Sequence, residues 1–127
     1  MALELGELTG LVIGAAIEVH RALGPGFLES VYERALALEL EARGIAFVRQ
    51  VEVPVHYRGV EVGLHRLDLF VAGELVVELK AVRELVPDHF AIVRSYLRAV
   101  GQEHGLLLNF GKVKLDVKRV LARPLPD

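Results

Sequence analysis

The sequence predicts an α/β (α+β) domain in which helices pack on a central mixed β-sheet, in the order α-α-β-β-β-α-β-β. Apolar residues recur at three- and four-residue spacing before residue 44 and again after residue 87, which is typical of amphipathic helices. Between these regions, and again after residue 105, short apolar runs separated by glycines are typical of strands. A chain of 127 residues can bury one continuous core, so we expect a single domain over residues 1–127.

Two helices are predicted at the start of the chain. The first covers Leu5–Leu23, where the apolar side chains form one stripe, and it ends at the helix-breaking segment Gly24–Gly26. The second covers Phe27–Arg43 and ends at Gly44. At 100° per residue, Glu29 falls inside the apolar arc of this helix, although a carboxylate in the first turn also complements the helix N-terminus.

The pattern then changes to strands over residues 45–57, 60–71 and 75–80. Pro54 lacks an N–H group, so the first of these strands is expected either to lie at an edge of the sheet or to break at this residue.

A third helix is predicted to open at Pro87, with Asp88 as its N-cap, and to end at Gly101. A buried strand over 105–111 and a last strand over 113–121 complete the sheet, and residues 124–127 form a tail.

The composition excludes several classes of function. Without cysteine, the chain has no disulfide, thiolate zinc site or cysteine nucleophile. A net charge of −2 argues against a surface coated with basic residues for tight nucleic-acid binding, so any phosphate contacts must be local. No apolar run reaches the roughly 18 residues of a membrane span, and the acidic first residues are unlike a signal peptide. We therefore expect a cytoplasmic protein that does not bind membranes and has no nucleotide-cofactor motif.

Charged residues interrupt two apolar strands that should form a hairpin. Asp68 lies in one strand, and Glu78 and Lys80 share a face of the next. A two-residue turn would pair Asp68 with Val77 and place it on the opposite face, whereas a three-residue loop or an equivalent bulge brings Asp68 to Glu78. We predict the odd-length loop, with Gly73 supplying a positive φ.

This pattern favours a divalent-metal site. Two carboxylates about 4 Å apart repel by about 4 kcal/mol at an effective dielectric constant near 20, and a cation between them reverses the sign of that interaction. Mg²⁺ or Mn²⁺ would take Asp68, Glu78 and the carbonyl of Leu79 as ligands and lower the pKa of a bound water, with Lys80 stabilising the charge that develops on a phosphate. An ordinary cross-strand acid–lysine pair on the surface is the alternative reading of the same residues.

The same residues carry a family resemblance. Asp68 followed by Glu78-Leu79-Lys80 resembles the signature of the PD-(D/E)xK nuclease superfamily, and the segment Gly26–Tyr32 matches the pattern that names the GxxExxY proteins. The segment Gly105–Gly111 (GLLLNFG) adds to this agreement. The resemblance implies a restriction-endonuclease-like core that hydrolyses nucleic acids, DNA in preference to RNA, through metal-activated water.

By matching position, the resemblance implies roles for individual residues. Asp68, Glu78 and Glu29 would be metal ligands and catalytic carboxylates, and Lys80 would be the catalytic lysine. Basic and aromatic residues of the third helix are the expected substrate contacts: Arg94, Tyr96 and Arg98.

One position departs from the pattern of the family. Related members carry glutamine four residues before Tyr96, where this chain has Ile92. Either Arg94 or His89 takes over the role of that glutamine, or activity is reduced or absent. Two other readings therefore stay open: a nuclease-fold module that binds nucleic acid without cleaving it, and an apolar subunit that serves assembly. A homodimer would supply the surface that so small a chain lacks for gripping a duplex.

Overall fold

A computed structural model describes residues 4–123, so the predictions for the first three residues and for the tail lie outside the described part. The elements follow in the predicted order: α1 Leu5–Leu23, α2 Glu29–Ala42, β1 Phe47–Tyr57, β2 Val60–Val71, β3 Leu75–Lys80, α3 Pro87–Val100, β4 His104–Asn109 and β5 Asp116–Leu121. The five strands form one sheet in the order β1-β2-β3-β4-β5. It is mixed, because β3 and β4 are parallel while the other neighbours are antiparallel. The predicted fold class is confirmed, and β1 with Pro54 lies at an edge as expected.

Several element boundaries differ from the prediction: α2 ends at Ala42, β1 begins at Phe47 and β4 covers His104–Asn109, and three further differences have a local cause. Helix α2 begins two residues later, at Glu29, because Leu28 has an extended backbone and occupies the N-cap. Asp88 was wrong as the N-cap of α3: Val86 takes that position, and its N–H group donates to Nδ1 of His89. Pro87 then fills the first helical position, where its missing N–H leaves no bond unmade. The last strand starts at Asp116 rather than at residue 113.

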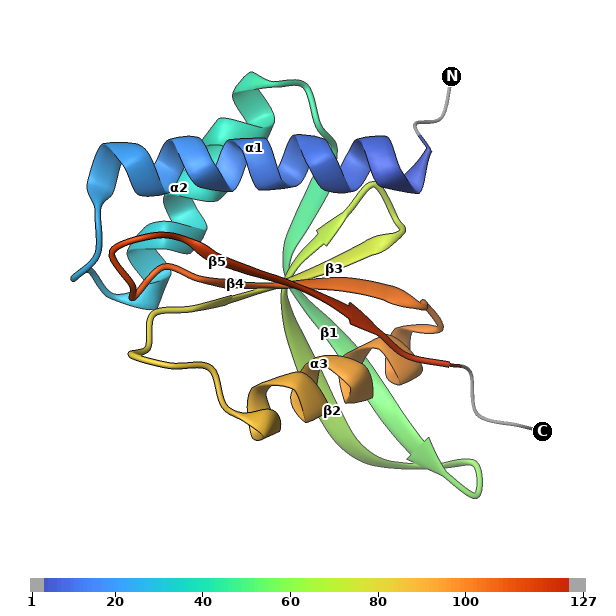
Figure 1. Ribbon diagram of the computed structural model, residues 1–127. Helices are drawn as coiled ribbons and strands as arrows, with labels where there is room; N and C mark the ends of the chain where they lie inside the picture. Colours follow the sequence, from blue (N-terminus) through green and yellow to red (C-terminus); the bar gives the residue numbers. More distant parts are fainter. Residues whose placement is uncertain (1–3, 124–127) are drawn as a thin grey trace.

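Two hydrophobic clusters lie on the two faces of the sheet. The first lies under α1 and α2 and includes Val12, Leu36, Val77 and Leu108. The second lies under α3 and includes Val76, Leu97 and Leu107. In Figure 1, α1 lies above the strands and α3 lies below them. Alternate residues of the central strands thus face different cores, which matches the near-continuous apolar runs in β3 and β4.

The hairpin of β1 and β2 turns sharply near its middle. Leu69 packs in the first cluster and Leu67 in the second, although residues two apart on a strand normally share a face. At this point Gln50 of β1 has a φ of 50°, and the ladder pairs its neighbours but omits Gln50 and Asp68. The part of the hairpin beyond this turn, residues 51–67, is called here the ribbon; its tip extends past α3 (Figure 1). Asp68 therefore lies where the chain passes from one layer to the other.

Candidate active site

The loop between β2 and β3 has the predicted odd length. Val71 pairs with Leu75, so three residues, Ala72 to Glu74, form the loop. Gly73 has a φ of +68° as predicted, and Ala72 also has a positive φ, 52°. Since Leu69 pairs with Val77, the next positions along the two strands, Asp68 and Glu78, lie opposite each other.

The two carboxylates replace backbone pairing at the point where β2 leaves β3. Paired residues extend only from Val71 to Leu69 on β2. Beyond them, the N–H of Asp68 donates to Oε1 of Glu78 at 2.9 Å, and the N–H of Leu79 donates to Oδ2 of Asp68 at 2.9 Å. We call this pair of residues, Asp68 and Glu78, the fork. Each carboxyl group satisfies one backbone N–H and is thereby oriented, while its second oxygen takes no part in these bonds.

Both carboxyl groups of the fork have raised pKa values. Burial raises the pKa of Glu78 to about 8, and the negative charge of Asp68 adds to the shift. Burial also raises the pKa of Asp68, although the hydrogen bond from the Leu79 N–H opposes this change. Two adjacent carboxylates, one buried and one half-buried, are costly to ionise together, so the pair holds one proton to a higher pH than separate carboxylates would. A divalent cation in place of that proton would stabilise both ionised groups.

Lys80 and Glu29 complete the charged cluster. The pKa of each of the three carboxyl groups is raised overall, and the positive charge of Lys80 opposes that rise for Glu29, Asp68 and Glu78. The ammonium group of Lys80 therefore acts on all three carboxyl groups. Glu29 is the first residue of α2 and is half-buried. Burial and then the charge of Asp68 raise the pKa of Glu29, so the two carboxyl groups are electrostatically coupled. The structure therefore brings all four predicted catalytic residues into one region.

The carbonyl group of Leu79 is directed toward the fork. The carbonyl of the next residue, Lys80, accepts from the N–H of Phe110, on the side of β4. Successive residues of a strand direct their backbone groups to opposite neighbours, so the carbonyl of Leu79 points toward β2. This is the orientation that a role as metal ligand requires.

The residues fit a cation that is held by few protein ligands. Within residues 4–123, no three histidine, aspartate or glutamate side chains are close enough to hold a metal as they stand, so Glu29 is not a preformed third ligand. Asp68 and Glu78 nevertheless offer two oriented carboxylates whose repulsion a cation would relieve. Mg²⁺ typically keeps several waters and binds one or two carboxylates, which matches this donor set.

A buried asparagine holds the chain that follows Lys80. Asn109 accepts from the N–H of Val82 and donates to the carbonyl of the same residue, at 3.0 and 2.9 Å. Next to it, a Cβ atom on Gly111 would lie only 2.4 Å from the carbonyl oxygen of Val82. The segment GLLLNFG thus fixes the end of β3, and with it Lys80. The sequence predicted a buried strand here and a family resemblance, but it did not predict the contacts of Asn109 and Gly111 with Val82.

Tyr32 fixes the loop from which Glu29 begins. Its buried hydroxyl donates to the carbonyl of Gly24 at 2.5 Å and accepts from the N–H of Phe27 at 3.2 Å. Its ring stacks on Phe110, with centroids 4.7 Å apart. The tyrosine of the GxxExxY pattern therefore holds the entry to α2.

Tyr96 of α3 has a pKa that the acidic cluster changes. Burial raises its pKa, and the charges of Glu78, Asp68 and Glu29 add to the shift. Its ring packs edge-on against His65, with centroids 4.6 Å apart. Tyr96 is therefore electrostatically coupled to the fork, and His65 lies against its ring.

The two arginines that were predicted to contact substrate lie further along α3. Arg98 is exposed and lines, with His56 and His65, a groove of about 410 Å³ between α3 and the ribbon. Arg94 is half-buried. Neither arginine contributes to the pKa shifts of the acidic residues, so of the three predicted contacts only Tyr96 is electrostatically connected to the fork.

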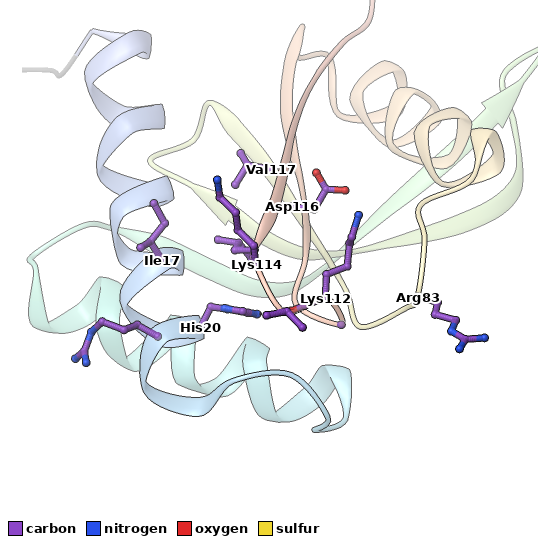
Figure 2. A pocket seen from close by; sticks show the side chains of 11 residues that line it. Ile17, His20, Arg83, Lys112, Lys114, Asp116 and Val117 are labelled. Atoms are coloured by element: carbon purple, nitrogen blue, oxygen red, sulfur yellow. The ribbon is translucent and has the colours of Figure 1, made fainter.

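A larger hollow of about 1040 Å³ lies apart from the fork, between the end of α1 and the segment that joins β4 to β5 (Figure 2). It is lined by Arg83, Lys112 and Lys114 among others, and by none of the acidic residues of the fork. In Figure 2 these three basic side chains point in different directions, and Lys112 also lies 3.5 Å from Glu84. The hollow therefore does not focus positive charge on one point.

A mixed sheet with helices on both faces, split at an acidic pair that a lysine follows, defines an α+β protein with a charged cluster where the sheet divides. Residues 6–120 match the model of the PD-(D/E)XK nuclease superfamily, and the chain belongs to that superfamily. The crystal structure of SSO0001 is similar in fold, with a TM-score of 0.61 and 18% identity over 77% of this chain. The match covers 52% of SSO0001, so this chain spans about half the length of that protein. A search of curated proteins found no match.

Proposed function

We propose that the protein is a metal-dependent nuclease that hydrolyses phosphodiester bonds of nucleic acids, DNA in preference to RNA. The observation that supports this most directly is the fork, where the N–H of Asp68 orients Glu78, the N–H of Leu79 orients Asp68, and the charge of Lys80 acts on both carboxyl groups. Membership in a nuclease superfamily makes the same chemistry the first expectation.

The residues divide the chemistry between them. Bound Mg²⁺ or Mn²⁺ would polarise the scissile phosphate and lower the pKa of a water molecule. Asp68, Glu78 and the Leu79 carbonyl would hold the cation, with Glu29 adding a carboxylate from α2. Lys80 places a positive charge where negative charge develops on the phosphate, and so stabilises the transition state. Tyr96, Arg94 and Arg98 would contact the nucleic acid along α3.

The family within the superfamily, the cellular location and the oligomeric state of the protein are proposed on the same basis. Within the superfamily we assign the chain to the GxxExxY proteins, because Glu29 and Tyr32 of that pattern both serve the entry to α2. In the part of the chain from residue 4 to residue 123, no helix has the length and apolar character to cross a membrane. A cysteine-free chain needs no oxidising compartment, so we propose a cytoplasmic location, and a homodimer as the form that grips a duplex.

Cleavage of defined substrates tests the proposal. Wild-type protein is incubated with single- and double-stranded DNA and RNA, with Mg²⁺, Mn²⁺ or EDTA, beside Asp68→Ala and Lys80→Ala. Glu52→Ala serves as the matched control, since it removes a carboxylate of the same hairpin that pairs only with exposed Arg66. We expect cleavage that needs metal, is lost in both site variants and persists in the control. Equal activity in all four proteins would refute the mechanism.

A second function, nucleic-acid binding without cleavage, is supported by Ile92. This residue is 40% exposed and lies one turn before Tyr96, where an amide side chain could reach substrate but an isoleucine cannot hydrogen-bond. Micromolar binding of DNA or RNA without cleavage, together with cleavage by Ile92→Gln, would favour this reading. Cleavage by the wild type that Ile92→Gln does not change would exclude it.

A further inference from the structure

A second carboxylate on α2 is fully engaged with β1. Glu33, one turn after Glu29, is only 7% exposed. Its Oε1 accepts from Nε2 of Gln50 at 2.6 Å, and its Oε2 accepts from Nη2 and Nε of Arg49, at 2.9 and 3.2 Å. Both oxygens of Glu33 are thus bonded to side chains of β1, and its negative charge also raises the pKa of Asp68.

The residue that Glu33 holds has an unusual backbone. Gln50 has a φ of 50°, in the left-handed region that side-chain-bearing residues seldom adopt. Such a conformation costs about 1–3 kcal/mol and persists only where neighbouring contacts enforce it. Among residues 4–123, the other non-glycine residues with positive φ are Arg58 and Ala72, which lie in hairpin loops, whereas Gln50 lies inside a strand.

Gln50 lies opposite Asp68 at the turn of the hairpin. The ladder omits this pair, and the ribbon beyond it packs on α3 instead of continuing the sheet. This turn separates β2 from β3 and leaves Asp68 free to accept from Leu79 rather than to lie in a regular ladder. The contact of Glu33 with Gln50 is therefore made at the position of β1 that lies opposite Asp68 of the fork.

We propose that Glu33 is a positioning residue: by capturing Gln50 and Arg49 it holds β1 in a left-handed turn that places Asp68 at the fork. Glu33 touches neither the cation nor the substrate. The proposal rests on the proposed function for its importance to catalysis, but its structural content is independent of any activity.

A glycine substitution separates this role from others. Glycine adopts positive φ without strain, so Gln50→Gly should keep the turn even when Glu33 is absent. The set is Glu33→Ala, Gln50→Gly, the double variant, and Glu33→Gln, whose amide oxygen can still accept from Gln50. Glu39→Ala is the matched control, because Glu39 is on the same helix and pairs with Arg43 at 2.7 Å but does not touch β1.

Amide hydrogen exchange reads the fork directly, without metal or substrate. The N–H groups of Asp68 and Leu79 both donate to fork carboxylates, and amides of β4 report global stability. We expect Glu33→Ala to lower protection of these two amides about tenfold or more relative to β4, as the release of a strained turn implies. The double variant should recover the protection of these two amides, Glu33→Gln should retain it, and Glu39→Ala should not change it.

Metal affinity and kinetics give the second readout. Calorimetric titration with Mn²⁺ should show weaker binding by about tenfold for Glu33→Ala and near-normal binding for the double variant. On a cleaved substrate, kcat should fall with little change in KM, because phosphate contacts along α3 are untouched. A wild type that neither binds Mn²⁺ nor cleaves would refute the proposed function, while the exchange experiment would still decide the role of Glu33.

Three results would overturn the inference. Unchanged protection of the Asp68 and Leu79 amides in Glu33→Ala would show that Glu33 does not hold the turn. Failure of Gln50→Gly to rescue Glu33→Ala would show that Glu33 does not act through the backbone of Gln50. If Glu33→Ala does not fold, the double variant decides: its folding supports the inference, and its failure to fold refutes it.

Discussion

Replacing Glu78 by glutamine tests the electrostatics of the fork without disturbing its shape. Glutamine keeps an oxygen that can accept from the N–H of Asp68 but carries no charge at any pH. In the metal-free wild type, the pKa of Glu78 is raised to about 8 from its ordinary value of 4.5. Between these two values the folded state binds a proton that the unfolded state has released, so stability falls as pH rises through this window.

The magnitude follows from the size of that window. For one proton, the slope is about 1.4 kcal/mol per pH unit, and over the 2.5 units between the ordinary pKa of 4.5 and pH 7 the accumulated loss is at most about 3 kcal/mol. The glutamine variant does not share this loss, so its advantage in free energy of unfolding over the wild type should grow from pH 5 to pH 7.

Urea unfolding in EDTA, at several pH values, measures this difference. Mg²⁺ or Mn²⁺ should then reverse the order of stability, because a cation stabilises the wild-type carboxylates and not the amide. Parallel stability profiles for wild type and Glu78→Gln would refute the raised pKa and, with it, the proton held at the fork.

Three further predictions concern the surrounding residues. Lys80→Ala should lower kcat by about a hundredfold or more while Mn²⁺ affinity, measured by calorimetry, is retained, since a charge that acts mainly in the transition state is removed. Tyr32→Phe should lower the free energy of unfolding by about 1–2 kcal/mol, measured by urea unfolding, because two hydrogen bonds of a buried hydroxyl are lost. Gly111→Ala should lower it by about 1–3 kcal/mol or prevent folding, since its Cβ would meet backbone atoms of Val82 at 2.4–2.6 Å. Wild-type values in any of these assays would contradict the corresponding role.

The fold could be predicted largely because local signals were strong. The stripe of α1 and the breaker after it fix both ends of that helix, and the observed bounds are the predicted ones. The N-cap of α3 was wrong because Asp88 and Val86 compete for one position, and Pro87 decides it by preferring the first helical turn. The start of α2 was early because Phe27 and Leu28 are apolar but exposed, and belong to the loop held by Tyr32.

The site was predictable where it depends on the odd number of residues in the β2–β3 loop and on the sequence motif. The odd loop at Gly73 follows from the alternation of side chains along a strand, and it brings Asp68 opposite Glu78 as expected. The turn at Gln50 could not be predicted in the same way. Neither Arg49 nor Gln50 is a residue that favours positive φ, and the group that holds them lies 16 and 17 residues earlier in the chain. A contact between distant segments decides this backbone conformation, and no local pattern reports it.

The fork shows why a metal site can be built where a sheet divides. When two strands separate, backbone N–H groups lose their partners, and each must be satisfied in another way. Asp68 and Glu78 do this with one oxygen each, so the same bonds that close the sheet also aim the remaining oxygens. The arrangement leaves a buried and a half-buried carboxylate close together, and ionising both is costly, as the raised pKa of Glu78 indicates. Cation binding would relieve that repulsion, so the affinity for metal and the instability of the empty site have one physical origin.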